Sequence, residues 1–192
     1  RVPVIGMDYG FLGRNNEKTN PIIIARDSRT GATYATWVPM EGASIQWVIR
    51  RLCNFIDGLG YTEVIIRSDQ EESIKAAQEA IRDRRKHSTM LENSPVGESR
   101  SNGLSEKAVQ EVTGMIRTLL DQAEDKLNTN RSEDAKIEIK GPLIAWLVEH
   151  AASTITRAKV GIDGKTPYQR LKGKKLNTMP PMWLERVLYS HC

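Results

Sequence analysis

Cysteine and histidine are scarce in this chain, which has 2 cysteines and 3 histidines among its 192 residues. Cys53 falls in a predicted helix and Cys192 is terminal. They do not form the disulfide framework of a small secreted protein, and a reducing compartment is favoured. The histidines are scattered and no CxxC pair accompanies them, which argues against a structural zinc site. Functional residues must therefore be sought among other residue types.

Long apolar runs are also missing: no stretch could span a bilayer, and no signal-peptide pattern is present. We therefore expect no membrane partner. The length and a hydrophobic content of 39% suit one globular domain with a sizeable core. Because the chain begins with Arg1 rather than Met and stops abruptly at Cys192, we expect it to be a piece of a longer polypeptide.

The charge balance is mildly basic, with a formal net charge of +4. Such an excess fits the binding of nucleic acid. Many ordinary soluble domains are as basic, so the charge alone does not assign this function.

Apolar patterning predicts alternating strands and helices. Short apolar runs that end in an acid, or that flank the hairpin signal Thr30-Gly31, indicate strands. Apolar residues at helical spacing indicate amphipathic helices. The predicted strands span 2–10, 20–28, 32–40, 61–70 and about 88–91. The predicted helices span 44–59, 71–86, about 102–127 and 142–157, with polar loops at 92–103 and 128–140.

The order of these elements predicts an α/β fold. The strand–helix–strand segments imply parallel pairing, whereas the first hairpin implies antiparallel pairing. We therefore expect a mixed five-stranded sheet flanked by helices on both faces. The tail beyond about residue 160 is basic and rich in turn-forming residues.

Three acidic residues stand where a metal site could form. Asp8 ends the first predicted strand and Asp69 ends the fourth, so both carboxylates are expected at the carboxyl edge of the sheet. Carboxylates placed together repel each other, and a hard divalent cation such as Mg²⁺, which prefers oxygen ligands, relieves that repulsion. Glu106, on the long helix that follows, can supply a third ligand.

Helical geometry separates Glu106 from the apolar face of its helix. One face holds Leu104, Ala108, Met115 and Leu119, and a polar stripe on the opposite face holds Glu106, Gln110, Thr113 and Arg117. Taken singly, a strand-end aspartate is often a turn residue or cap, and an acid near a helix start is favoured by the helix dipole. The three acids together, in the order strand, strand, helix, favour the metal site.

The stretches around these acids form a recognisable set. They read VIGMDYG with Asp8, VIIRSDQEES with Asp69, and SPVGESRSNGLSEKAVQ with Glu106, the last two acids being 37 residues apart (106 − 69 = 37). Downstream follow LVEHAASTITR and GKTPYQRLKGKK. With these motifs nearly the whole chain resembles the catalytic core of retroviral and retrotransposon integrases, most closely that of copia-type elements.

This resemblance implies a ribonuclease H-like catalytic core over residues 1–160, followed by a basic C-terminal extension at 161–192. It implies a polynucleotidyl transferase that trims the 3′ ends of element DNA and joins them to target DNA. In such enzymes three acids hold a pair of Mg²⁺ or Mn²⁺ ions. Here Asp8 would contact both ions, Asp69 one of them and Glu106 the other. No covalent enzyme intermediate is implied, which agrees with the scarcity of cysteine and histidine.

The sequence departs from the family pattern in two places. Gln70-Glu71 stands where many relatives have Asn-Gly, and Pro95-Val96 stands where they often have Pro-Gln. Neither change removes a ligand, but both alter the residues with which a loop would contact DNA. Glu98 is a rival third acid. Glu106 is preferred because it lies on a helix three residues after Gly103, as in the family, whereas Glu98 lies in a predicted loop.

Polar and basic residues near Glu106 and in the tail are candidate DNA contacts. One set lies in the predicted loop before the helix, a second follows Glu106 on the helix, and a third lies in the tail beside Lys165 and Arg170. In that order the sets are Arg100, Ser101 and Asn102; Lys107, Gln110 and Arg117; and Lys172, Lys174 and Lys175. The alternative for the helix and the tail is an ordinary solvated surface.

The resemblance also implies binding partners and cellular locations. The partners are double-stranded DNA, as element ends and as target, and further copies of the chain in a dimer or higher oligomer. Trp146 and the 142–157 helix are candidate interface elements. Action in the nucleus is implied, after a stage in a cytoplasmic virus-like particle.

Three rival interpretations stay open. The first is a ribonuclease H-like nuclease that hydrolyses without strand transfer, although such enzymes generally carry a fourth acid. The second rests on VIGMDYGFLG, which loosely resembles the phosphate loop of sugar kinases and actin-like ATPases, but those proteins are longer and duplicate the domain. The third is a domesticated, non-catalytic core that only binds DNA or a partner.

Overall fold

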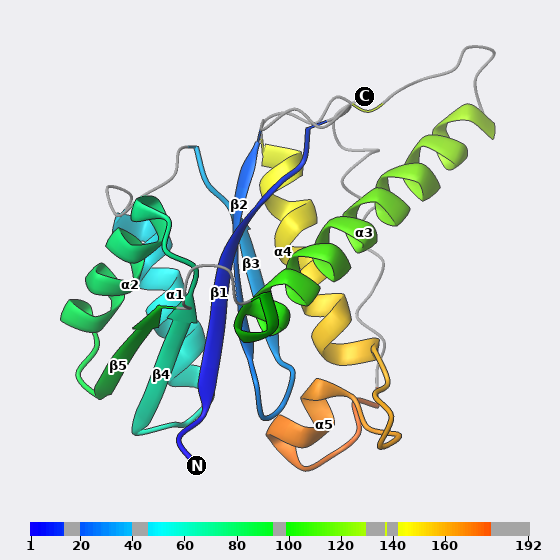
Figure 1. Cartoon of the computed structure of the whole chain (residues 1–192). Helices are drawn as coiled ribbons and strands as arrows, with labels where there is room; N and C mark the ends of the chain where they lie inside the picture. Colours follow the sequence, from blue (N-terminus) through cyan, green and yellow to red (C-terminus); the bar gives the residue numbers. More distant parts are fainter. Residues whose placement is uncertain (14–19, 40–45, 94–98, 130–136, 138–141, 178–192) are drawn as a thin grey trace.

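The computed structural model describes residues 1–13, 20–39, 46–93, 99–129, 137 and 142–177, of which 99–102, 127, 129 and 142 are described by their backbone only (Figure 1). The strands are β1 (Val4–Phe11), β2 (Pro21–Asp27), β3 (Thr33–Trp37), β4 (Glu63–Ser68) and β5 (Ser88–Asn93). The helices are α1 (Gln46–Gly58), α2 (Glu72–Arg84), α3 (Ser99–Thr129), α4 (Pro142–Ala158) and α5 (Pro167–Lys172). Among these helices, none is both long and apolar enough to cross a membrane.

The strands form one mixed sheet in the order β3-β2-β1-β4-β5. β1 pairs antiparallel with β2, and β2 with β3, which is the predicted hairpin. β1 and β4 pair in parallel, as do β4 and β5, because each connection passes through a helix. The expected five-stranded mixed sheet is therefore confirmed.

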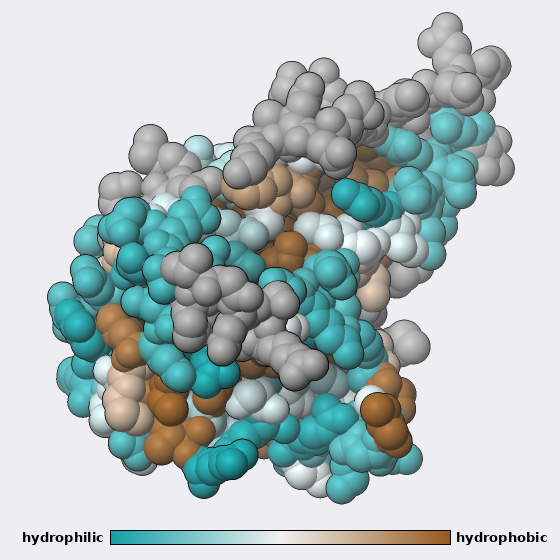
Figure 2. Space-filling model, in the orientation of Figure 1, coloured by the Kyte–Doolittle hydropathy of each residue, from teal (hydrophilic) through white to brown (hydrophobic). Residues whose placement is uncertain are grey.

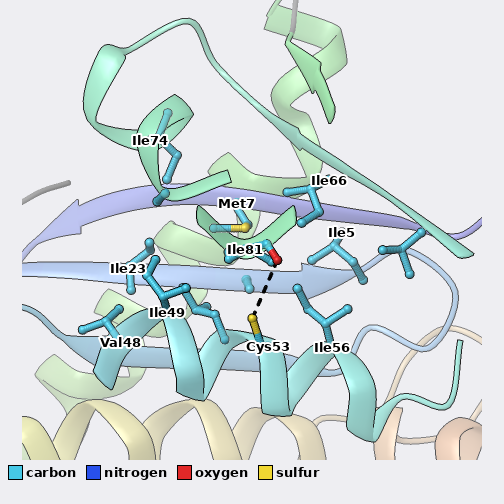
Figure 3. Packing of buried hydrophobic residues seen from close by; sticks show 14 of the residues in the cluster. Ile5, Met7, Ile23, Val48, Ile49, Cys53, Ile56, Ile66, Ile74 and Ile81 are labelled. Atoms are coloured by element: carbon cyan, nitrogen blue, oxygen red, sulfur yellow. Dashed lines mark hydrogen bonds between the residues drawn. The ribbon is translucent and has the colours of Figure 1, made fainter. Parts of the chain in front are cut away.

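Two apolar layers hold helices against the two faces of the sheet. Side chains of alternate residues such as Ile5 and Met7 pack with α1 and α2 (Figure 3). Ile22 and Ile24, on the other face, pack with α3 and α4. β2 is buried on both faces, which explains why its apolar residues run continuously instead of alternating with polar ones.

Cys53 belongs to the first of these layers. It is buried and free, and its thiol donates to the Ile81 carbonyl oxygen at 3.9 Å (Figure 3). Burial raises the pKa of the Cys53 thiol, which lowers its reactivity. Cys53 is therefore a core residue.

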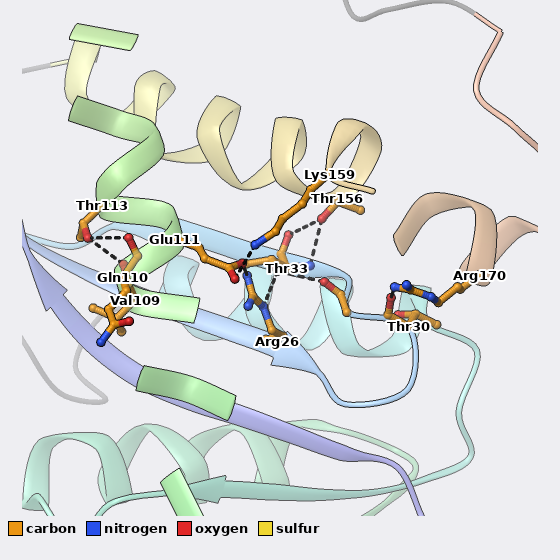
Figure 4. A network of polar contacts seen from close by, with 11 residues as sticks. Arg26, Thr30, Thr33, Val109, Gln110, Glu111, Thr113, Thr156, Lys159 and Arg170 are labelled. Atoms are coloured by element: carbon orange, nitrogen blue, oxygen red, sulfur yellow. Dashed lines mark hydrogen bonds and ion pairs between the residues drawn. The ribbon is translucent and has the colours of Figure 1, made fainter. Parts of the chain in front are cut away.

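A polar network fixes α3 and α4 to the β2–β3 hairpin (Figure 4). Arg26, only 6% exposed, donates to Glu111 at 2.7 Å and to the Thr33 hydroxyl at 2.8 Å. Lys159 pairs with the same glutamate. The Thr156 hydroxyl bonds both backbone groups of Thr33, at 2.9 and 3.0 Å. Although burial raises the pKa of Glu111, its hydrogen bonds from Lys159 and Arg26 outweigh this and hold that pKa below its ordinary value.

The tail differs from the expectation of a turn-rich extension, because residues 167–172 form α5. Thr166 accepts a hydrogen bond from Gln169 N, and Gln169 Oε1 accepts one from Thr166 N, which makes a capping box. Pro167 occupies the first turn, and Gly173 ends the helix with a φ of 70°. The motif TPYQRLKG is thus a set of start and stop signals for one short helix.

Candidate active site at the carboxyl ends of β1 and β4

The parallel pairing of β1 with β4 aligns two of the predicted acids. The last paired residues are Gly6 and Arg67. Asp8 lies two residues after Gly6, and Asp69 lies two residues after Arg67. The same register, continued beyond the paired residues, places these two acids on neighbouring chain segments. Adjacent strands lie about 4.8 Å apart where they pair, so the backbones that lead to Asp8 and Asp69 start from neighbouring positions.

Asp8 lies inside β1 rather than at its end, which corrects the sequence-based expectation. β1 continues to Phe11 because its antiparallel pairing with β2 runs as far as Phe11 and Pro21. Its parallel pairing with β4 stops earlier, at Gly6. Asp8 is therefore held by one neighbouring strand and open towards Asp69 on the other side. Asp69 does follow the last residue of β4, as expected.

Glycines on either side of Asp8 let α3 approach the sheet. Because side chains alternate along a strand, Gly6, Asp8 and Gly10 share one face. A Cβ built on Gly6 would lie 3.1 Å from the Leu104 side chain, and one on Gly10 would lie 3.1 Å from Val109. The motif VIGMDYG thus places Asp8 under the first turns of α3. Glu106 follows directly from the residues that touch Gly6, and it is exposed.

The pKa of Asp8 responds to its burial and to the neighbouring acids. Burial and the charge of Asp69 raise the pKa of Asp8 to about 6, with smaller contributions from Glu71 and Glu106. The Tyr9 N–H, which donates to Asp8 Oδ1 at 2.8 Å, acts in the opposite direction. Four carboxylates therefore contribute to one region of negative potential.

Glu71 is the residue that sequence reasoning missed as part of this region. Its backbone N–H donates to Asp69 Oδ1 at 3.1 Å, so it follows Asp69 in a tight turn at the start of α2. The signal lies in SDQEES, where a second acid, Glu71, follows Asp69 after one residue.

The donor set fits a hard divalent cation in its chemistry, since it consists of carboxylate oxygens. The mutual repulsion that raises the pKa of Asp8 is the cost that such a cation removes. Among the described residues, no three His, Cys, Asp or Glu side chains are already gathered closely enough to enclose an ion. Binding of an ion would therefore require these side chains to rearrange. Glu106 can do so because it is exposed and does not pack in the core. Glu98, the rival third acid, lies outside the described residues.

The faces of α3 agree with the helical prediction. Glu106, Gln110 and Arg117 are exposed, and Lys107 beside them is exposed as well. The buried face of the helix includes Ala108, Val112, Ile116 and Leu119. Thr113 is half-buried, and its hydroxyl donates within the helix to the Val109 carbonyl at 2.8 Å. The stripe that begins at Glu106 is thus open to solvent.

One set of predicted DNA contacts begins the helix α3 instead of lying in a loop. The backbone of Arg100, Ser101 and Asn102 is helical, because α3 begins at Ser99, whereas a loop was predicted. Once a long helix is nucleated, adding a turn at its start requires little free energy. The side chains of these three residues lie outside the description.

The tail lysines stand at the opposite end of the sheet from the acids. Arg170, on α5, donates to the Thr30 carbonyl oxygen at 2.9 Å, and Thr30 belongs to the β2–β3 turn beside the start of β1. Lys172, Lys174 and Lys175 are exposed there. They are therefore not part of the carboxylate site (Figure 1).

The sheet order, the pairing directions and the helices on both faces define a ribonuclease H-like fold. Neither known protein families nor curated proteins give a match to the sequence. Solved structures do match in fold. One is a chain of the simian T-cell lymphotropic virus intasome, in complex with PP2A regulatory subunit B56 gamma, with a TM-score of 0.60 and 20% identity over 92% of this chain. Another is the catalytic core domain of BIV integrase, with a TM-score of 0.56 and 16% identity over 88% of this chain.

The extents of these matches differ. The chain accounts for 93% of the BIV catalytic core domain but for only 56% of the intasome chain. It therefore has the fold of a retroviral integrase catalytic core, and spans just over half of the larger chain.

Proposed function

We propose that this chain is the catalytic core of a copia-type retrotransposon integrase, carried in a longer polyprotein, that joins element DNA to target DNA. The observation that supports the proposal is the parallel pairing of β1 with β4, which ends two residues before Asp8 and two residues before Asp69, beside the helix that bears Glu106. The motifs around these residues and the shared fold support the same assignment.

Asp8, Asp69 and Glu106 are the proposed catalytic residues and the proposed ligands of a pair of Mg²⁺ or Mn²⁺ ions. Such ions, when bound, lower the pKa of the attacking hydroxyl group and stabilise the leaving oxygen. The chain itself orients two of the carboxylates, since backbone N–H groups hold one oxygen of Asp8 and one of Asp69. This fixes where negative charge is concentrated before any ion or DNA arrives.

The exposed residues of α3 are proposed to position DNA at this site. Lys107 and Arg117 can neutralise phosphates, and Gln110 can donate to phosphate or base edges. Arg100, Ser101 and Asn102, at the start of the same helix, are proposed to contact the DNA end. Under this proposal one set of carboxylates serves both the 3′-end trimming of element DNA and its joining to target DNA.

The biological setting is proposed from the resemblance. The core would act in the nucleus after passing through a cytoplasmic virus-like particle, and as a dimer or higher oligomer. Trp146, on α4, is half-buried and stacks on His150 with ring centroids 4.7 Å apart. It remains the candidate interface residue.

A hydrolytic nuclease with the same fold is the second candidate. The observation that favours it is Glu71, a fourth acid close enough to influence Asp8. Under this alternative the same carboxylates would cut nucleic acid and release the ends.

A labelled duplex with a free 3′ hydroxyl, incubated with plasmid DNA and Mn²⁺, separates the two candidates. An integrase core gives labelled products longer than the substrate, and Glu71→Gln leaves these products in place. A nuclease gives only shorter products, and Glu71→Gln reduces their yield. Only shorter products from the unmodified chain would refute the strand-transfer proposal.

A further inference from the structure

The end of the sheet opposite the carboxylates is built from segments far apart in the sequence. Ser28 N donates to the Val4 carbonyl at 2.8 Å, and Val4 N donates to the Ser28 hydroxyl at 3.0 Å, which joins the β2–β3 turn to the start of β1. Pro167 lies beside the same turn, 3.5 Å from a Cβ built on Gly31. The start of β1, the turn and α5 therefore form one continuous surface (Figure 1).

A buried carboxylate makes this surface rigid. Asp27 is fully buried. It accepts hydrogen bonds from Thr30 N at 2.9 Å, from the Thr30 hydroxyl at 2.6 Å, from Arg29 N at 3.2 Å and from the Tyr61 hydroxyl at 3.0 Å. Burial, together with the charge and hydrogen bond of Asp27, raises the pKa of Tyr61 to about 12. The phenol therefore stays protonated, and the turn and the Tyr61 ring are held in one arrangement.

Arg29 lies over the Tyr61 ring, with its guanidinium carbon 5.7 Å from the ring centroid. Its Nη2 donates to the Arg1 carbonyl oxygen, and the remaining donors of the planar guanidinium match the geometry of phosphate. Beside it is an open depression of about 500 Å³, whose lining includes Arg1, Thr62 and Glu63. The lower edge of the molecule carries both hydrophilic and hydrophobic residues (Figure 2).

Three lysines carry further positive charge at the same end of the sheet. Lys172, Lys174 and Lys175 are exposed at and after the end of α5. Arg170 fixes α5 to the β2–β3 turn, since it bonds the Thr30 carbonyl and pairs with Asp163. Arg170 is thus a structural cation, whereas the lysines face solvent.

We propose that this hairpin-end surface, formed by Arg29, Tyr61, Lys172, Lys174 and Lys175, binds the phosphodiester backbone of a nucleic acid at a site separate from the carboxylates. Cations spread along a rigid surface suit a polymer with regularly spaced phosphates, and the stacked guanidinium supplies one oriented contact. Val4, at this end, and Asp8 are four residues apart on β1, about 13 Å. One protomer could thus hold a second stretch of nucleic acid without occupying the catalytic site.

The test is binding of a fluorescent 30-base-pair DNA duplex in EDTA, measured over a range of KCl concentrations. The test variant is R29Q/K172Q/K174Q/K175Q. The control variant is R50Q/R82Q/R84Q/K86Q. It removes four exposed cations, of which one lies on α1, two lie on α2 and one follows α2. We expect the test variant to bind about tenfold or more weakly at 100 mM KCl, and its slope of log affinity against log salt to be smaller by about 3 to 4, since each phosphate contact contributes about 0.9.

The control variant should bind within about twofold of the unmodified chain, with an unchanged slope. Equal weakening of both variants would overturn the proposal, because it would show only a general effect of net charge. An unchanged slope in the test variant would also overturn it, as would tighter competition by poly-glutamate than by DNA. Matching thermal unfolding curves confirm that each variant is folded. Since EDTA removes divalent ions, this result is independent of whether the chain joins DNA.

Discussion

Replacing Asp8 with asparagine should make the metal-free protein more stable at neutral pH. The folded-state pKa of Asp8 is raised from its ordinary 3.8 to about 6 by burial and by the neighbouring carboxylates. Because the pKa of Asp8 is higher in the folded state than in the unfolded state, protonation of Asp8 stabilises the folded state. This stability is fully present below about pH 4 and is lost as the pH rises through about 6. Above that range the ionised group opposes folding.

The size of the expected gain in stability follows from the pKa shift of Asp8. The difference between 3.8 and about 6 corresponds to about 3 kcal/mol, and screening by water at this partly exposed side chain reduces it to about 2 kcal/mol. Asp8→Asn keeps the acceptor for Tyr9 N but removes the charge. Its free energy of unfolding in EDTA at pH 7.5 should therefore exceed that of the unmodified chain by about 2 kcal/mol.

Urea denaturation at several pH values measures this difference. The difference in free energy of unfolding between the variant and the unmodified chain should shrink to nearly zero at pH 4, where Asp8 is protonated in the folded state. Asp121→Asn, at an exposed position on α3, is the control and should change stability by less than about 0.5 kcal/mol. An Asp8→Asn variant that is no more stable than the unmodified chain at pH 7.5, or whose gain is independent of pH, would refute the reasoning.

Three further predictions follow from the packing. Gly6→Ala places a methyl group 3.1 Å from Leu104 and should cost about 1–3 kcal/mol in urea denaturation, with reduced DNA joining because α3 is displaced. Glu111→Gln leaves the buried guanidinium of Arg26 without its counter-charge and should cost about 3 kcal/mol in the same measurement. Thr166→Ala removes the cap of α5 and should cost about 1 kcal/mol, with faster hydrogen exchange in α5.

The first two of these predictions have matched comparisons. Gly58→Ala, where a Cβ would meet nothing within 4 Å, should not destabilise as Gly6→Ala does. Glu149→Gln, in an exposed ion pair with Arg51, should cost less than about 1 kcal/mol. If Glu149→Gln and Glu111→Gln cost the same, burial is not what makes the Glu111 pairs important. Unchanged exchange in the Thr166→Ala variant would show that the cap is dispensable.

The sheet could be predicted because its signals are local. The Thr30-Gly31 turn marked the hairpin, and the helices between later strands required parallel pairing. The placement of Asp8 beside Asp69 followed from the same rule. The position of Asp8 within β1 could not be read from the sequence, since it depends on how far β1 pairs with β2 compared with β4.

The remaining misses have different physical origins. α5 could have been found, because Thr166 and Gln169 stand at capping-box spacing with proline between them and glycine after the helix. The pairing of Arg26 with Glu111 could not, because it joins residues 85 positions apart through the packing of α3 on the sheet. Local patterns specify elements and their ends, whereas contacts between distant elements require the assembled fold.

The central claim is that Asp8, Asp69 and Glu106 act together in metal-dependent DNA joining. Its most direct test is the transfer of a labelled 3′-hydroxyl oligonucleotide into plasmid DNA with Mg²⁺ or Mn²⁺. The unmodified chain is compared with Asp69→Asn, Glu106→Gln and the exposed control Glu79→Gln. The account predicts joining by the unmodified chain and the control, and a loss of about a hundredfold or more in the other two variants. Joining by Glu106→Gln at the unmodified rate would contradict it.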